Sequence, residues 1–246
     1  MIWQPGVALA CALYGLLVGQ LVPSIIARIP EPEPEPADER ASEGDGAHPP
    51  RTEEKIPYEE IARSRGLRAG SAVACAVAAG AVGGATGWTP ALSFLLFLVP
   101  VGVALAVVDW KTRRLPTKVI APTYFVVAPL AVLSAWAVDD WSRALGALIG
   151  GAAAGGLYLL MWLIYPAGMG YGDVRLSGIL GIALGWLGWP ELVVGIWSGF
   201  LFGGVGGALL ALFRIVDRKA NPFGPFMLLG ALAGIVLGPS VGAWYA

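Results

Sequence analysis

Long apolar stretches are the feature that most limits what this chain can fold into. Hydropathy windows of about 19 residues predict eight membrane-spanning helices, at approximately 6–27, 70–87, 90–108, 119–138, 144–165, 176–190, 192–213 and 224–244. The composition agrees, because 57% of the residues are hydrophobic and only 13% are charged, whereas about 25% of a soluble domain is charged. We therefore expect an all-α, polytopic membrane helical bundle of about eight transmembrane helices.

A polar segment separates the first predicted span from the others. It begins with alternating Pro and Glu, EPEPEPADERASEGDG, a composition that cannot bury a core and favours an extended, solvated chain. Its last part, KIPYEEIARSRG, could form a short surface helix. The predicted division is a first transmembrane helix at 1–27, a partly disordered polar loop at 28–69 on the cytoplasmic side, and a membrane core of about seven helices at 70–246.

Basic residues are distributed very unevenly between the loops that join these spans. Alternate loops, at 28–69, 109–118, 166–175 and 214–223, hold 15 of the 16 Lys and Arg residues, and the opposite loops hold only Arg143. Loops rich in Lys and Arg stay in the cytoplasm. The pattern predicts that these four loops are cytoplasmic and that both termini lie on the outer side.

Two carboxylates remain once the other acidic residues are assigned to loops and turns. Of the 17 acidic residues, 11 lie in the polar stretch 31–60. Asp109 ends the apolar run LLFLVPVGVALAVVD, and Asp173 lies in YPAGMGYGDVRLSG; both fall at the predicted cytoplasmic boundary of the membrane. An ionisable group at membrane depth is costly and usually functional. The alternative is a solvated helix-end carboxylate, or one paired with a nearby arginine, Arg113 or Arg175.

Glycines surround the second carboxylate. Gly168, Gly170 and Gly172 permit backbone conformations that other residues avoid, so we expect a non-helical break at this point. Such a break is tolerated at membrane depth only where it is buried in protein or lines a wet cavity. The pattern therefore predicts a cavity beside Asp173.

Two carboxyl groups that share one water molecule suit hydrolysis of a peptide bond. They cannot both ionise, so they share a proton. The ionised member takes a proton from the attacking water, and the protonated member polarises the scissile carbonyl. No Ser/His or Cys/His arrangement competes, because the single histidine, His48, lies in the Pro/Glu-rich stretch. A catalytic metal is not expected either, since no His/Cys cluster is present in the sequence.

Four segments resemble one family in their residues and in their order along the chain. The chain is similar to the prepilin peptidases, the type IV leader peptidases that are GxGD-type membrane aspartic proteases. The segments are GLLVGQLVPSIIARIP at 15–30, DWKTRRLPTKVIAP at 109–122, GYGDVRLSGILG at 170–181 and NPFGPFMLLGALAG at 221–234.

The resemblance implies a reaction and roles for five residues. Such enzymes remove the leader peptide from prepilin or pseudopilin precursors at the cytoplasmic face of the inner (plasma) membrane. By motif position, Asp109 and Asp173 would be catalytic. Gly170 and Gly172 would shape the loop, and Arg175 would support the loop or the charge of the second aspartate.

One departure from the family concerns its second activity. Many members carry two CxxC pairs in the first cytoplasmic loop, but residues 28–69 of this chain contain no cysteine, so zinc is not expected. Longer members also methylate the new N-terminus. Because much of their loop is replaced here, methyl transfer stays open. Proteolysis requires no cofactor, and S-adenosylmethionine would be needed only if methyl transfer occurs.

Two other functions stay open from the sequence. One is a GxGD protease with a different membrane substrate, and the other is a non-catalytic transporter or assembly factor. The net charge of −1 gives no basic field for nucleic acid, so the expected partners are the lipid bilayer and the precursor substrates. The oligomeric state is not indicated.

Overall fold

A computed structural model describes residues 3–31, 57–166, 169–207 and 222–245. Every regular element in these ranges is a helix. The elements are α1 (Pro5–Val18), η1 (Gly19–Leu21), α2 (Val22–Ala27), α3 (Tyr58–Ala62), α4 (Leu67–Thr86), α5 (Leu92–Thr112), α6 (Thr117–Ala137), α7 (Trp141–Ile164), α8 (Tyr171–Leu187), α9 (Trp189–Leu201), the π-helical η4 (Phe202–Gly206) and α11 (Gly224–Tyr245). The expected all-α architecture is confirmed.

Within the described residues, six helical stretches are long and apolar enough to cross a membrane. They are the continuous run Pro5–Ala27 and the helices α4, α5, α6, α7 and α11. The prediction of a polytopic membrane protein is therefore confirmed. Helices α8 and α9 occupy the places of the sixth and seventh expected spans, but they have only 17 and 13 residues. The count of eight spans stays a prediction.

The predicted polar loop is described only at its two ends. Residues 32–56, which include His48, lie outside the described residues. The short helix expected near the end of the loop is present as α3, and its Tyr58 and Ile61 are buried against the bundle. The Tyr58 backbone N–H donates to a carboxylate oxygen of Glu31 at 2.7 Å, so the two ends of the loop meet.

The boundary of α8 differs from the expectation. The sixth span was expected to begin at residue 176 after a non-helical, glycine-rich break, but α8 begins at Tyr171 and holds Asp173 in its first turn. Gly170 precedes the helix with an ordinary extended backbone, at φ −72° and ψ 144°. Residues 169–170 are not helical, so the expected break ends at Gly170 and does not include Gly172 or Asp173. The helix begins earlier than expected because a carboxylate in its first turn stabilises its N-terminus. Gly168 lies outside the described residues.

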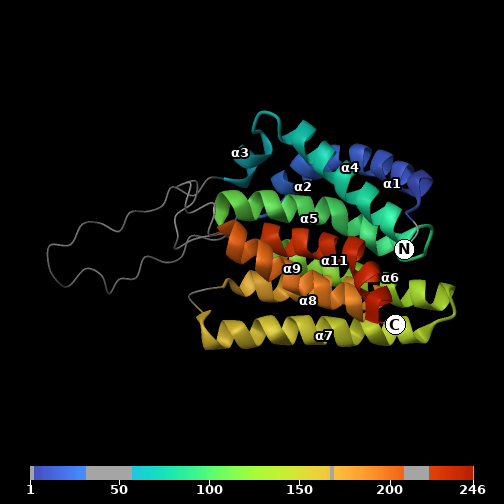
Figure 1. Ribbon diagram of the computed structural model, residues 1–246. Coiled ribbons are helices and arrows are strands. Elements are labelled where there is room, and N and C mark those ends of the chain that lie inside the picture. The colour runs from blue at the N-terminus through green and yellow to red at the C-terminus, as the bar shows by residue number, and fades with distance from the viewer. Residues whose placement is uncertain (1–2, 32–56, 167–168, 208–221, 246) are drawn as a thin grey trace, which may run out of the picture.

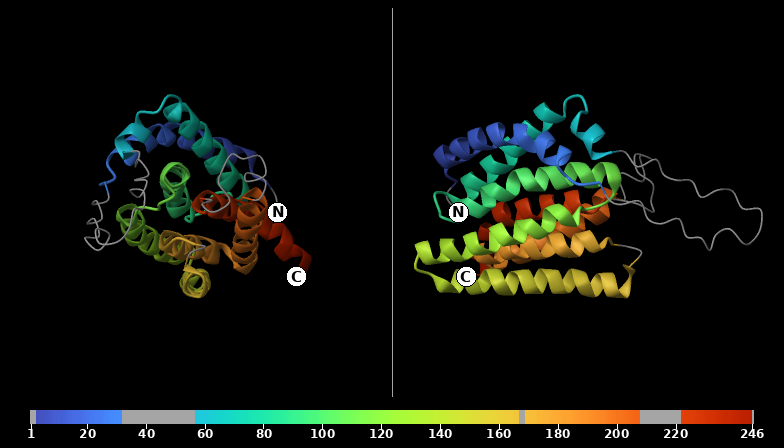
Figure 2. Two further views of the ribbon diagram at one scale, coloured as in Figure 1. Left: turned by 90° about the vertical axis from the view of Figure 1, so that its left-hand side faces the viewer. Right: turned by 180° about the vertical axis from the view of Figure 1, so that it is seen from behind.

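The helices run roughly parallel or antiparallel, with α5 near the middle of the bundle (Figure 1). Helices α1 and α4 lie on one side of α5, and α8 and then α7 lie on the other. The main helix pairs are α1 with α4, α7 with α8, and α9 with α11. The start of α1 and the end of α11 lie at one end of the bundle. The opposite end carries α3, and we call it the α3 end (Figure 2).

Glycines allow two of these helix pairs to approach closely. A methyl group added at Gly150 of α7 would come within 2.8 Å of the Gly185 Cα atom of α8. A methyl group at Gly234 of α11 would come equally close, at 2.8 Å, to the Gly195 Cα atom of α9. Small residues at such contacts are the usual way in which helices pack in a membrane.

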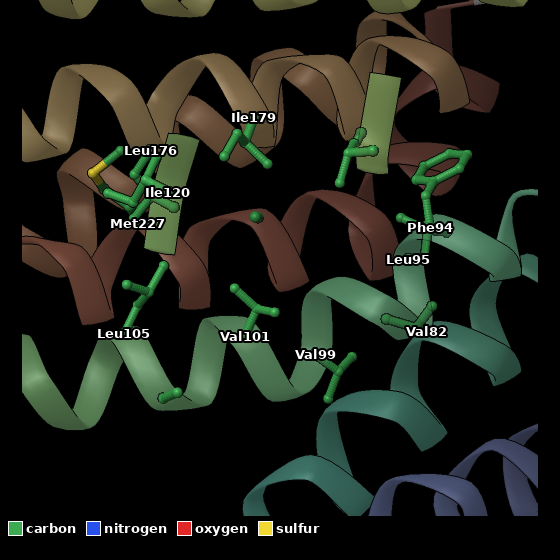
Figure 3. Close-up of a cluster of buried hydrophobic side chains, with 14 of the residues drawn as sticks. Val82, Phe94, Leu95, Val99, Val101, Leu105, Ile120, Leu176, Ile179 and Met227 are labelled. Atoms are coloured by element: carbon green, nitrogen blue, oxygen red, sulfur yellow. The ribbon is translucent and has the colours of Figure 1, made fainter. Parts of the chain in front are cut away.

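Helix α5 is apolar around its whole circumference, which is typical of a helix surrounded by other helices and by lipid. Its Val101 and Leu105 side chains point toward neighbouring helices, where Ile120 of α6, Leu176 of α8 and Met227 of α11 gather (Figure 3). The central position of α5 places its last turn beside the first turns of α6, α8 and α11.

Candidate active site

Four chain segments meet at the α3 end of the bundle. They are the end of α5, the loop that leads into α6, the start of α8 and the start of α11 (Figures 1 and 2). Each of α6, α8 and α11 begins here, so their first backbone N–H groups have no partner within their own helix. Such N–H groups attract negative charge.

Asp109 lies in the last turn of α5 and is buried, with 4% of its surface exposed. Its Oδ2 atom accepts a hydrogen bond of 3.0 Å from the backbone N–H of Gly224, the first residue of α11. A side chain at Gly224 would collide with this carboxylate, because an added Cβ atom would lie 2.8 Å from Oδ2. Glycine is therefore required there for close approach.

Asp173 lies in the first turn of α8 and is also buried, with 6% of its surface exposed. Its Oδ2 atom accepts a hydrogen bond of 3.1 Å from the Gly170 backbone N–H. Both aspartates thus bind a backbone N–H at a helix N-terminus. Among the described residues, no donor reaches the Oδ1 atom of either carboxyl group.

The two aspartates belong to one site. They lie close enough for their charges to interact. Leu115, in the loop between α5 and α6, packs against the glycines next to both aspartates. A Cβ atom added at Gly172 would be 2.6 Å from the Leu115 Cβ atom, and one added at Gly224 would be 3.4 Å from the Leu115 Cδ1 atom. Gly172 is thus needed for the close contact between α8 and the loop.

No ion pair joins either aspartate to an arginine in the part of the chain that the structure describes. Arg113, proposed above as an alternative partner of Asp109, is exposed and caps the end of α5 with a left-handed backbone, at φ 54°. The arrangement favours two buried carboxyl groups over solvated or salt-bridged helix ends.

Arg175 connects α8 to α6. Its guanidinium group lies over the Tyr171 ring, 4.5 Å from the centroid, and it donates a hydrogen bond to the Thr117 hydroxyl in the first turn of α6. Its backbone carbonyl accepts a hydrogen bond of 2.7 Å from the Tyr124 hydroxyl. The expected role of Arg175, support of the loop or of the charge of Asp173, stays a prediction.

Tyr158 of α7 is a neighbour of the site that the sequence did not indicate. It is 2% exposed, stacks on Phe200 at 5.1 Å between ring centroids, and lies near Phe223 at 6.2 Å. It is close enough to Asp173 to interact with its charge. The only signal in the sequence was a hydroxyl inside an otherwise apolar span.

A cavity of about 20 Å³ lies beside Tyr158 and Ser177, one helical turn along α8 from Asp173. A cavity needs roughly 10–15 Å³ to hold one water molecule. The Ser177 hydroxyl donates to the Val174 carbonyl at 2.7 Å, so its lone pairs can still accept a hydrogen bond. The cavity can therefore hold a single water molecule beside Ser177, although neither aspartate lines it.

The site suits acid–base chemistry on a water molecule. Two neighbouring buried carboxyl groups share one proton, so one can act as a base while the other acts as an acid. Within the described ranges, no three His, Cys, Asp or Glu side chains gather where they could hold a metal ion.

Comparisons with known proteins identify relatives of this chain. The model of the type IV leader peptidase family matches residues 96–238, more than half of the chain, and this range includes both aspartates and Gly224. A prepilin leader peptidase/N-methyltransferase of Aeromonas salmonicida (strain A449) is 32% identical over 168 residues, which cover 65% of this chain and 53% of that protein. One of Escherichia coli (strain K12) is 30% identical over 171 residues, covering 67% of this chain and 69% of that protein.

The chain thus spans about half the length of the first of these relatives. No solved structure matches it.

Proposed function

The chain belongs to the type IV leader peptidase family, and we propose that it is a membrane aspartic endopeptidase that removes the leader peptide from prepilin or pseudopilin precursors. The observation that carries the proposal is the pair of buried carboxyl groups, Asp109 and Asp173, each bound to a backbone N–H at the start of a helix. The names of the relatives support the same class of substrate.

The proposed mechanism assigns one proton to the pair. The ionised carboxylate removes a proton from a water molecule held between the two side chains, and the protonated carboxyl donates a hydrogen bond to the scissile carbonyl oxygen. The water oxygen then attacks the carbonyl carbon, and a proton from the pair reaches the leaving nitrogen. The N–H groups of Gly224 and Gly170 hold the two carboxyl groups in place during these steps.

The remaining site residues position this pair. Gly172 lets the first turn of α8 lie against Leu115, and Arg175 fixes the start of α8 to α6 through Thr117. Gly170 supplies the backbone N–H that binds Asp173. We assign no residue to a metal ion, and the proposed proteolysis uses no cofactor.

We further propose that the α3 end faces the cytoplasm and that the protein is an inner-membrane protein. The concentration of basic residues in the predicted cytoplasmic loops supports this orientation, since the described parts of these loops lie at the α3 end. The proposed organisation keeps a first transmembrane helix at 1–27, a polar loop at 28–69 and a peptidase core at 70–246. A substrate cleaved at this end would present its leader on the cytoplasmic side.

Methyl transfer is a second candidate activity. The relatives' printed names include N-methyltransferase, and an enzyme of that kind on this chain would require S-adenosylmethionine. The match covers only about half of the first relatives. We therefore propose that the described core carries out proteolysis. Methylation is a separate question, which the experiment below also answers.

The experiment is mass spectrometry of a prepilin co-expressed with this protein. We expect the precursor to lose its leader with the wild-type protein and to remain intact with Asp109→Asn or Asp173→Asn. Asp139→Asn is the matched control, because Asp139 lies at the opposite end of the bundle and its left-handed backbone, at φ 52°, also suits Asn. Cleavage by either of the first two variants would contradict the proposal. A mass increase of one methyl group on the cleaved product would reveal the second activity.

A further inference from the structure

A large groove runs along α5 between α4 and α11, and none of the residues assigned to the proposed proteolysis lines it. Its volume is about 880 Å³. The walls are apolar over most of their length, and they include Val77, Leu98, Val103, Leu228 and Leu232. Val77 and Leu229, which line it, are 64% and 52% exposed, so the groove opens on the outer surface of the bundle at membrane depth.

The polar lining of this groove is confined to the α3 end. Ser64 and Arg65 come from the turn before α4, and Trp110 and Lys111 come from the last turn of α5. None of the described residues that line the groove is acidic. Neither Arg65 nor Lys111 forms an ion pair with any residue in the described ranges.

We infer that this groove binds an anionic phospholipid, with its acyl chains along α5 and its phosphate at Arg65 and Lys111. A phospholipid matches the groove in its polarity, because it has long apolar chains and a charged group at one end. Basic pockets between transmembrane helices bind anionic headgroups in this way, and Trp side chains such as Trp110 favour the level of the headgroups.

Charge selects this occupant over an apolar helix of another protein. An apolar helix would leave the two cations at the end of the groove without a counter-charge, and a helix with basic residues at that end would repel them. A zwitterionic lipid would bring its own positive charge to the same place. An anionic phospholipid satisfies both the apolar walls and the two cations.

The first test measures lipid selectivity. The protein is reconstituted in vesicles of equal parts phosphatidylglycerol and phosphatidylcholine, extracted in mild detergent and examined by native mass spectrometry. We expect the wild-type protein to retain phosphatidylglycerol in preference to phosphatidylcholine. In the double variant Arg65→Gln/Lys111→Gln, the ratio of retained phosphatidylglycerol to phosphatidylcholine should fall roughly tenfold. Arg113→Gln/Lys118→Gln is the matched control, since these exposed cations lie at the same end but outside the groove.

The second test fills the apolar part of the groove. Ala78→Leu/Ala106→Leu adds bulk to the walls formed by α4 and α5, and we expect it to reduce retained lipid of both kinds. Ala153→Leu on the exposed side of α7 is the control and leaves retention unchanged. Circular dichroism and size-exclusion chromatography of each variant establish that it is folded.

The third measurement identifies the occupant directly. A photo-crosslinking amino acid placed at Val103 in the living cell is expected to yield an adduct with the mass of a phospholipid. An adduct with the mass of a protein would show that an apolar helix occupies the groove and would overturn the inference. Equal retention of the two lipids by the wild-type protein, or unchanged retention in both groove variants, would overturn it as well.

Discussion

The Asp109 carboxylate at the end of α5 accepts the backbone N–H of Gly224 at the start of α11, at 3.0 Å and across 115 positions of sequence. The bond joins the central helix of the bundle to its last one and fixes one member of the carboxyl pair. A helix N-terminus supplies this N–H without a side chain, and its dipole favours the ionised carboxylate. The following predictions test this bond and the other contacts of the site.

Gly224→Ala should reduce cleavage of a prepilin by about tenfold or more. The added methyl group would lie 2.8 Å from Asp109 Oδ2, so either the carboxylate or the start of α11 must move, and such overpacking costs roughly 1–3 kcal/mol. The measurement is the rate of precursor shortening in membranes. Gly156→Ala is the control, because nothing lies within 4 Å of its added methyl group; an equal loss in both variants would contradict a local cause.

Gly172→Ala should harm cleavage more than Gly170→Ala. A methyl group at Gly172 would lie 2.6 Å from Leu115 Cβ, whereas at Gly170 the nearest atom is Asp173 Oδ2 at 3.3 Å. The backbone of Gly170 is also ordinary extended chain, which alanine adopts. The two variants are compared for cleavage rate at equal membrane abundance. The reverse order would mean that the Leu115 contact does not position α8.

Cleavage should depend on pH as a bell-shaped curve. At low pH both carboxyl groups are protonated and no base remains, and at high pH both are ionised and no acid remains. The initial rate is measured on a synthetic precursor in detergent across the stable pH range of the protein. A rate that rises steadily to a plateau would argue that one titrating group suffices, and the shared-proton mechanism would then be wrong.

Tyr124→Phe should destabilise the contact between α6 and α8. It removes the 2.7 Å hydrogen bond from the Tyr124 hydroxyl to the Arg175 carbonyl, which is worth about 1 kcal/mol of unfolding free energy. Thermal unfolding in detergent is expected to shift to lower temperature. Tyr165→Phe, at a side chain that is 65% exposed, provides the control and should leave the midpoint unchanged.

The sequence predicted the class of fold because a membrane imposes a simple length and polarity rule on each helix. The apolar stretches located the helices to within a few residues in most cases. Antiparallel alternation of those helices then placed Asp109 and Asp173 at the same end of the bundle. The rule misplaced the start of α8, because the glycine-rich break ends at Gly170 and Asp173 stabilises the first turn of the helix.

Only the tertiary structure decided what each side chain of the site contacts. Gly224 binds Asp109, Leu115 lies between two glycines, Tyr158 lies near Asp173, and Arg175 binds Thr117 rather than an aspartate. Hydropathy fixes the depth of a residue along its helix but not the direction in which it faces. The direction in which a side chain faces depends on which helices lie next to each other. Small residues on two different helices, such as Gly150 and Gly185, together determine which helices can pack closely.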